Sequence, residues 1–285
     1  MSSYIIKGGN KLEGTVRISG SKNASLPIIA ATILNKGTTT LYNIPNIQDT
    51  QMMYEIIKLL GGKVQKKKNK VIINTSNINK YEIPDTLMHK MRSSVIIVGA
   101  IVGRYKTATF TYPGGCEIGS RPIDLHLKAF EKLGIHINQN YGNITCNAEK
   151  IIGNKIDFDF PSVGATENAI LASILAEGKT TITNAAREPE IIDLQNFLNT
   201  MGAKIKGAGT NEIEIEGVKK LKEISYNIMP DRIEAGTFLC LAAITGGKIK
   251  LEKTNPNHLT PIIAKLEEAG CEIKTKKETI EIRQS

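Results

Sequence analysis

The chain has 285 residues, which is longer than one typical domain and enough to bury a substantial hydrophobic core. Hydrophobic residues make up 41% and charged residues 23%, which excludes a disordered chain, and no apolar stretch is long enough for a membrane span. The net charge of +9 raises nucleic acid as a partner, but the lysines are scattered and aromatic residues are only 5%, so we expect no nucleic-acid binding.

A small polyanionic substrate and a merely solvated lysine-rich surface both remain compatible with this charge. The start of the chain lacks the apolar run of a signal peptide, so we expect a cytoplasmic protein that does not bind membranes. The cysteines show neither a C-x-x-C pair nor a histidine at ligand spacing, which favours neither a zinc site nor a disulfide framework. They are Cys116, Cys146, Cys240 and Cys271.

One structural unit recurs four times along the chain. Its marker is an amphipathic helix that ends at a glycine and leads into a β-hairpin, and the marker glycines lie about 70 residues apart. The turn at Lys68–Asn69 places the basic run 66–70 at an exposed hairpin tip. We predict marker helices over 52–60, 125–133, 191–201 and 262–269, with their glycines at 61, 134, 202 and 270.

A second helix precedes each marker helix and is apolar on nearly every face, which is typical of a protein interior. A short β-rich piece follows each one, so the unit reads strand, buried helix, strand, surface helix, strand, strand. Neighbouring units must pack their inner helices together and turn their sheets outward. Three units form one globule, and the fourth, after the Lys/Glu-rich segment 217–223, is without companions. We predict the inner helices over 24–34, 93–102, 166–176 and 235–244.

Two segments carry candidate chemistry. Lys22 lies among Gly and Ser at the start of the first inner helix, where a cation and free amides suit an anion; the alternative is an ordinary helix cap with one exposed lysine. Cys116 lies in a loop with three glycines, so its thiol is a candidate general acid or an incidental free thiol. The other three cysteines lie in strand or helix patterns, where a thiol usually packs.

The later units offer similar groups at the same place. Arg92 and Ser162–Gly164 precede the second and third inner helices, and repeat symmetry gathers these helix starts at one end of the globule. In the fourth unit Pro230–Glu234 either closes over the site or only caps its helix. The four histidines share no spacing, and we interpret them as surface or structural residues with no metal role.

Five motifs follow one another along the chain. They are Gly20–Ala24, Met91–Ser94, Pro113–Cys116 with Gly119–His126, Pro161–Asn168 and Pro230–Glu234. In this order they resemble the enolpyruvyl transferases, and in particular those that act on UDP-N-acetylglucosamine. The resemblance runs from residue 4 to the end of the chain and implies an α/β fold, the inside-out α/β barrel built from repeated βαβαββ units. The related shikimate-pathway enzymes share this fold but lack the cysteine loop.

The resemblance implies transfer of the enolpyruvyl group from phosphoenolpyruvate to the 3′-hydroxyl of UDP-N-acetylglucosamine with release of phosphate, without a cofactor. This reaction is the first committed step of peptidoglycan synthesis. Cys116 corresponds to the general acid that fosfomycin alkylates, and Lys22 and Arg121 to contacts with the phosphoenolpyruvate phosphate. The sugar-nucleotide contacts would be Asn23, Arg92, Arg121, Pro122, Ile123, Asp124, Leu125, Ser162, Val163 and Gly164, and the groups for domain closure Asp231 and Arg232.

The sequence departs from the family in one respect, because the family has six units in two domains and four units occur here. We therefore expect a complete three-unit domain over 22–229 and a partial second domain made of 1–21 plus 230–285. The family's aspartate base would lie in units beyond Ser285, so no residue here is assigned that role. The alternative to a catalytic protein is a truncated fragment that binds the UDP-sugar without turnover.

Overall fold

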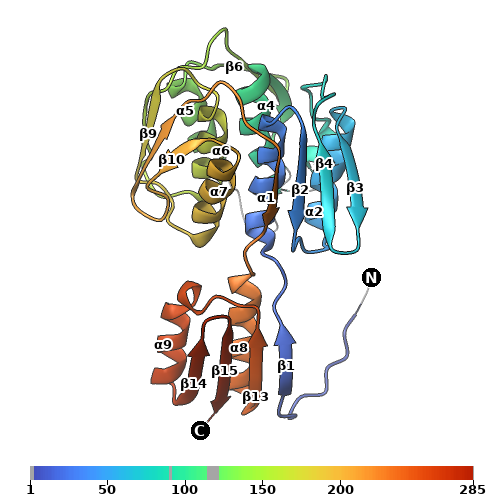
Figure 1. Cartoon of the computed structure of the whole chain (residues 1–285), viewed down its shortest axis with the longest axis vertical. Coiled ribbons are helices and arrows are strands. Elements are labelled where there is room, and N and C mark those ends of the chain that lie inside the picture. Colours follow the sequence, from blue (N-terminus) through green and yellow to red (C-terminus); the bar gives the residue numbers. More distant parts are fainter. Residues whose placement is uncertain (1–2, 90–91, 114–121, 285) are drawn as a thin grey trace. The chain divides into compact units, whose positions relative to one another are not determined.

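The structure is a computed structural model that describes residues 3–89, 92–113 and 122–284, without the side chains of Arg92 and Ser93 (Figure 1). The chain divides into two compact units. One is Lys22–Ile228, and the other joins the chain up to Ser21 with the chain from Met229 onward.

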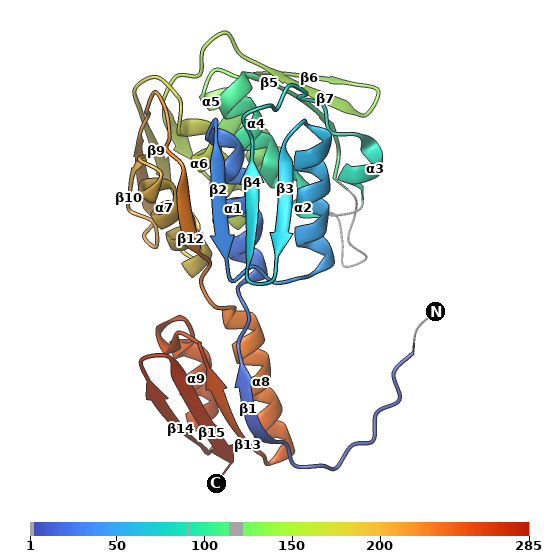
Figure 2. The same cartoon turned by 45° about the vertical axis from the view of Figure 1, so that its right-hand side comes forward.

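The inner helices have the apolar character that the sequence predicts. In the unit Lys22–Ile228 they are buried at its centre, with the sheets around them (Figures 1 and 2). α1 continues into the short helix η1 (Thr32–Leu34), and η2 (Arg92–Val95) leads into α4. The inner helices are α1 (Lys22–Ala31), α4 (Ile96–Tyr105), α6 (Val163–Ser173) and α8 (Arg232–Thr245).

The surface helices end where the sequence predicts. Each of the four marker glycines has a positive φ, between 80° and 106°, directly after the last turn of its helix. Glycine closes a helix in this left-handed conformation without a Cβ clash. These helices are α2 (Gln48–Leu59), α5 (Asp124–Lys132), α7 (Pro189–Thr200) and α9 (Thr260–Glu268).

Each recurring unit contributes one sheet, and alternate residues of most strands are buried. The first sheet has the order β12 (Ile224–Asn227), β2 (Thr38–Tyr42), β4 (Lys70–Asn74), β3 (Lys63–Lys67). The second has the order β5 (Thr107–Thr111), β7 (Asn143–Asn147), β6 (His136–Asn140). The third has β10 (Lys204–Lys206), β11 (Glu212–Glu216), β9 (Lys179–Thr183), β8 (Lys155–Asp157). The fourth has β1 (Glu13–Arg17), β13 (Lys248–Glu252), β15 (Thr279–Gln284), β14 (Cys271–Lys276).

The strand that leads into an inner helix does not always pair within its own unit. β8 pairs in parallel with β9 of its own unit, but β1, which leads into α1, pairs with β13, and β12, which leads into α8, pairs with β2. The amide of Asn43 donates to the Ile228 carbonyl at 2.9 Å, and Asn184 donates to the Phe158 carbonyl at 2.9 Å. An asparagine amide therefore forms the equivalent hydrogen bond to the lead-in strand in both cases, whether that strand comes from the same unit or from another unit.

Two close approaches explain the small residues of α4. A methyl group on Gly99 would lie 2.5 Å from Oδ1 of Asn168, and one on Gly103 would lie 2.9 Å from the Leu171 carbonyl. α4 and α6 thus pack nearly backbone to backbone at these positions. A side chain at either glycine would overpack the contact.

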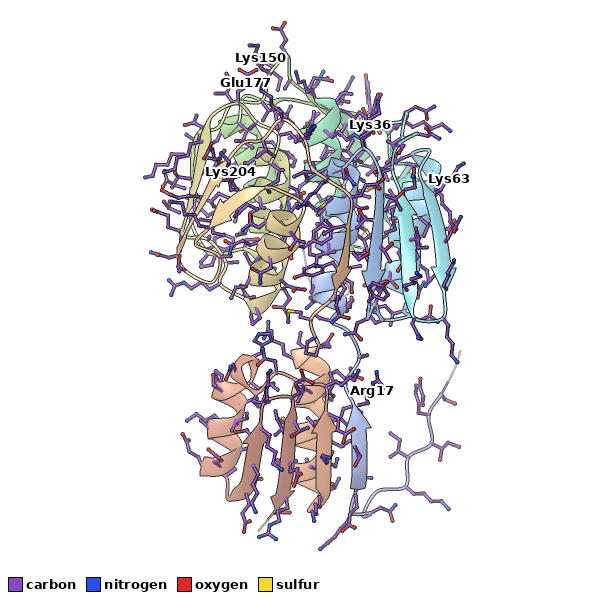
Figure 3. The ribbon with its side chains drawn as sticks, in the orientation of Figure 1. Arg17, Lys36, Lys63, Lys150, Glu177 and Lys204 are labelled. Carbon is purple, nitrogen blue, oxygen red and sulfur yellow. The ribbon has the colours of Figure 1, made fainter. Side chains whose placement is uncertain are left out.

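The basic run at 66–70 spans the turn between β3 and β4, which confirms the predicted hairpin tip. The other lysines are distributed over the surface, as Lys36, Lys63, Lys150 and Lys204 illustrate in Figure 3. Several form ion pairs with neighbouring carboxylates, such as Lys150 Nζ with Glu177 Oε1 at 3.4 Å. Exposed pairs of this kind contribute little stability.

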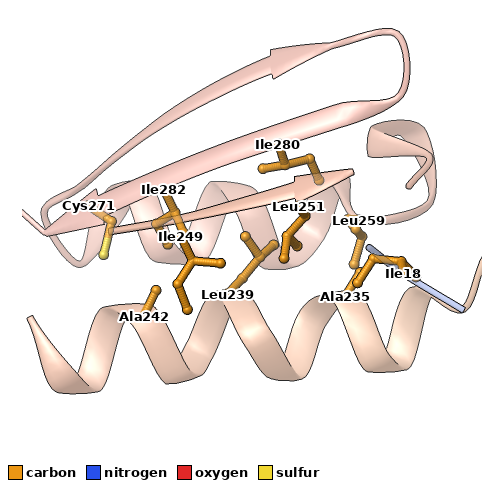
Figure 4. Packing of buried hydrophobic residues seen from close by; sticks show 10 residues of the cluster. All are labelled: Ile18, Ala235, Leu239, Ala242, Ile249, Leu251, Leu259, Cys271, Ile280 and Ile282. Carbon is orange, nitrogen blue, oxygen red and sulfur yellow. The ribbon is translucent and has the colours of Figure 1, made fainter. Parts of the chain in front are cut away.

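The unit that contains Met229 onward has its own small core between α8 and the fourth sheet (Figure 4). Only one side of α8 is buried, so the prediction of an enclosed helix holds for one face. Ile244 is 84% exposed, and Cys240 is exposed too, which contradicts the expectation that this thiol packs. The core residues are Ile18, Ala235, Leu239, Ala242, Ile249, Leu251, Leu259, Cys271, Ile280 and Ile282.

Two further short helical segments occur in the described chain. η3 (Pro256–His258) precedes α9, and α3 (Asp85–Met88) precedes η2. Among the described residues, no helix combines the length and apolar character needed to cross a membrane.

Candidate substrate-binding site

The starts of α4 and α6 lie at the same end of the unit Lys22–Ile228. Gly99 faces Asn168, and four residues further along both helices Gly103 faces Ala172, so the two helices run in the same direction. α1 packs against α4, and Arg104 Nη1 near the end of α4 donates to the carbonyls of Ile33 at 2.6 Å and Asn35 at 3.2 Å. The ends of α1 and α4 therefore meet, and α1 runs in the same general direction.

The starts of α5 and α6 are in direct contact. A methyl group on Gly164 would lie 3.2 Å from His126 Cε1, and His126 belongs to the first turn of α5. This contact brings Asp124–Leu125 and Ser162–Gly164 together, two segments that sequence reasoning assigned to the sugar nucleotide. Pro122 and Asp124 are exposed, Ile123 is buried, and Leu125 is half-buried.

Ser162 is the N-cap of α6. Its Oγ accepts a hydrogen bond from the Ala165 amide at 3.4 Å, and residues 162–164 are half-buried. Unused amides and the positive end of the helix dipole favour an anion at such a terminus. The α6 start therefore has the chemistry required for a diphosphate.

The buried side chain of Asn168, on α6, forms hydrogen bonds to the starts of α4 and α5. Its Nδ2 donates to the Val95 carbonyl at 2.9 Å and lies 2.7 Å from His126 Nδ1, while its Oδ1 accepts from the Gly99 amide at 2.9 Å. Sequence reasoning missed both members of this contact as functional residues. The signal was present, because His126 and Asn168 each stand at the end of a motif that carries the family resemblance.

Lys22 and Asn23 are exposed at the start of α1. Lys22 Nζ lies 2.6 Å from Oδ2 of Asp49, a residue in the first turn of α2. An anion bound by Lys22 would share the ammonium group with this carboxylate. Asp49 would thus compete with a bound phosphate for the lysine.

Three predicted residues cannot be placed from side-chain geometry. Cys116 and Arg121 lie outside the described residues, and for Arg92 only the backbone, in η2, is described. Asp231 is the N-cap of α8 and accepts hydrogen bonds from the amides of Ile233 at 2.8 Å and Glu234 at 3.0 Å. Asp231 therefore caps α8, and Arg232 lies in the first turn of the same helix.

Three glutamates that sequence reasoning did not single out approach one another where α6 meets α7. Glu167 is 2% exposed and Glu190 is 1% exposed, while Oε2 of Glu188 is buried and has no hydrogen-bond partner. Burial first, and then the negative charges of Glu190 and Glu188, raise the pKa of Glu167 well above its ordinary value. Glu167 is therefore a buried carboxyl that holds its proton more tightly than an exposed glutamate does.

Within the described ranges, no cluster of His, Cys, Asp or Glu side chains is arranged to hold a metal ion. Cys146 and Cys271 are buried, and burial raises the pKa of the Cys146 thiol to about 12. His89 pairs with Asp85 at 2.7 Å on the surface.

The geometry defines an α/β protein in which α1, α4 and α6 begin at one end of the unit Lys22–Ile228, with helix N-termini whose amides favour an anion. The profile of the EPSP synthase (3-phosphoshikimate 1-carboxyvinyltransferase) family matches residues 6–285. The chain belongs to this family of carboxyvinyltransferases, which confirms the predicted resemblance.

Its fold is the inside-out α/β fold of solved relatives. The enolpyruvyl transferase NikO from Streptomyces tendae has a TM-score of 0.87 at 21% identity and covers 98% of this chain and 67% of its own.

The curated relatives are more similar in sequence. UDP-N-acetylglucosamine 1-carboxyvinyltransferase 2 from Caldanaerobacter subterraneus subsp. tengcongensis is 52% identical over 99% of this chain and 68% of its own length. The protein of the same name from Clostridium tetani is 50% identical over 96% of this chain and 66% of its own. The chain thus spans about two thirds of the length of these relatives.

Proposed function

We propose that this chain belongs to an enzyme that transfers the enolpyruvyl group from phosphoenolpyruvate to the 3′-hydroxyl of UDP-N-acetylglucosamine and releases phosphate. The observation that carries the proposal is the contact between the starts of α5 and α6. It occurs in a chain about 50% identical to relatives named UDP-N-acetylglucosamine 1-carboxyvinyltransferase. The proposed role is the first committed step of peptidoglycan synthesis, in the cytoplasm, and through it cell-wall formation, cell shape and division.

In the proposed complex the α6 start, with Ser162–Gly164, binds the diphosphate, and residues 121–125 seat the uridine. Asn23 and Arg92 hold the sugar nucleotide, and Lys22 with Arg121 binds the phosphate of phosphoenolpyruvate. Fixed donors of this kind stabilise the negative charge of the tetrahedral intermediate before phosphate leaves. Asp231 and Arg232 are proposed to take part in domain closure.

Proton transfer is assigned to the cysteine loop. C2 of phosphoenolpyruvate gains the sugar oxygen while C3 gains a proton, and Cys116 is proposed to supply that proton as the general acid. Loss of phosphate from C2 together with a proton from C3 then restores the double bond of the enolpyruvyl group. We propose that the unit Lys22–Ile228 is the complete domain of three repeats and that the other unit is part of a second one. The base for the sugar hydroxyl is not assigned to a residue of this chain.

Two measurements on the 285-residue chain test the proposal. Isothermal titration with UDP-N-acetylglucosamine should show saturable binding, and a phosphate-release assay with both substrates reports turnover. Binding with no phosphate release would support the alternative function, a sugar-nucleotide binding fragment. No binding of the sugar nucleotide would contradict both.

The cysteine assignment has a separate test. In the presence of UDP-N-acetylglucosamine, fosfomycin should add to Cys116 and to no other cysteine, as peptide mass spectrometry can determine. Exposed Cys240 is an internal control for non-specific alkylation. Labelling of Cys240 in place of Cys116 would refute the assignment.

A further inference from the structure

The hydrogen bonds of Asn168 determine which ring nitrogen of His126 carries the proton. The Gly99 amide can only donate and the Val95 carbonyl can only accept, so these two backbone groups orient the Asn168 side chain without ambiguity. The Nδ2 group therefore faces His126 Nδ1 at 2.7 Å as a donor. His126 Nδ1 must be the acceptor, and a neutral ring then carries its hydrogen on Nε2.

The ring is neutral because it is enclosed. His126 is 8% exposed, and burial lowers its pKa to about 4. Asn168 thus selects one tautomer of a neutral imidazole, with a single N–H donor at Nε2. Among the residues that the structure describes, Nε2 has no hydrogen-bond partner.

The Nε2 edge of the ring faces the start of α6. A methyl group on Gly164 would lie 3.2 Å from Cε1 and 3.5 Å from Nε2, so a side chain at this position would crowd the ring. The absence of a Cβ at Gly164 leaves the ring edge beside the same helix terminus that Ser162 caps. A donor on the edge of a buried ring and the amides at the start of α6 therefore converge on one place.

We propose that His126 is a further binding residue for the diphosphate, that it donates a hydrogen bond from Nε2, and that Asn168 is the positioning residue that fixes its tautomer. This inference rests on the proposed function and adds to it a donor from α5. Asn168 also ties α5 and α4 to α6, so one side chain keeps three segments of the site in register.

Titration of UDP into the 285-residue chain and its variants tests the donor. His126→Leu removes the hydrogen bond to a charged group and should weaken UDP binding about tenfold or more. His126→Gln, whose amide reaches the Nε2 position, should remain within about threefold of the wild type. His136→Leu, the same substitution at an exposed histidine of β6, is the matched control and should leave binding unchanged.

Uridine binding by the His126→Leu variant distinguishes the loss of one hydrogen bond from misfolding of the variant. His126→Leu should leave uridine binding, measured by saturation-transfer NMR, at the wild-type level, because uridine has no diphosphate. Equal weakening of UDP and uridine, or unchanged UDP binding, would overturn the donor role. If the wild type binds neither, the proposed function fails together with it.

The tautomer is measured on the wild-type chain, independently of any variant. Long-range ¹H–¹⁵N correlation spectra at pH 7 should show the His126 hydrogen on Nε2, with an unprotonated Nδ1. Asn168→Asp presents a carboxylate to Nδ1 and should move the hydrogen to that nitrogen. A wild-type ring protonated at Nδ1 would overturn the positioning role of Asn168.

Discussion

Replacing Glu167 by Gln should stabilise the protein at neutral pH. Burial and the negative charges of Glu190 and Glu188 raise the pKa of Glu167 well above its ordinary value of 4.5, so the folded chain keeps this proton at pH values where the unfolded chain releases it. Each pH unit between the two pKa values costs about 1.4 kcal/mol of folding stability. Glutamine has nearly the same shape and is neutral in both states, so Glu167→Gln should raise the free energy of unfolding at pH 7 by about 1 kcal/mol or more.

The pH dependence of this gain follows from the sign of the pKa shift. Below pH 4.5 the carboxyl is protonated in the folded and the unfolded chain, so the two proteins should differ little there. As the pH rises above 4.5, the unfolded wild type releases this proton before the folded wild type does, so the wild type loses stability relative to the variant. The gain should therefore grow as the pH rises from 4.5 toward the raised pKa of Glu167.

Urea unfolding, followed by circular dichroism at several pH values, measures the difference. Glu131→Gln, at an exposed glutamate of α5, is the control and should change stability by less than about 0.5 kcal/mol at every pH. A loss of stability in Glu167→Gln at pH 7, or a difference that does not vary with pH, would show that Glu167 is ionised and paired, and the reasoning would be wrong.

Three further predictions follow from packing and exposure. Gly103→Ala should destabilise the protein by about 1–3 kcal/mol, because the new methyl group has only 2.9 Å to a backbone carbonyl of α6; unchanged urea unfolding would contradict this contact. Arg104→Met should lower the free energy of unfolding by about 2–4 kcal/mol, because the backbone carbonyls that accept from the guanidinium lose their donor. The control Arg283→Met, at an exposed ion pair, should lower it by less than about 1 kcal/mol. Equal losses of stability in the two variants would contradict the prediction. Cys240 should react with a thiol reagent in the folded protein and Cys146 only after unfolding, as peptide mass spectrometry can show; early labelling of Cys146 would contradict its burial.

Local features of this protein could be predicted from the sequence because short-range interactions determine them. Helix ends at Gly61 and Gly202 depend on one residue's freedom to take a positive φ. The hairpin tip at 66–70 follows from alternation on either side of a turn. The four repeats follow from the same local patterns recurring along the chain.

Tertiary structure decided the pairings between distant segments. Nothing local to β1 or β12 distinguishes pairing within a unit from exchange, since a strand of either kind satisfies the same sheet edge. The contact of His126 with Asn168 joins residues on different helices, and the burial of Glu167 depends on where α7 begins. The sequence by itself therefore determined the repeats and the family, while the contact of His126 with Asn168 and the raised pKa of Glu167 depend on packing between helices, which no local pattern records.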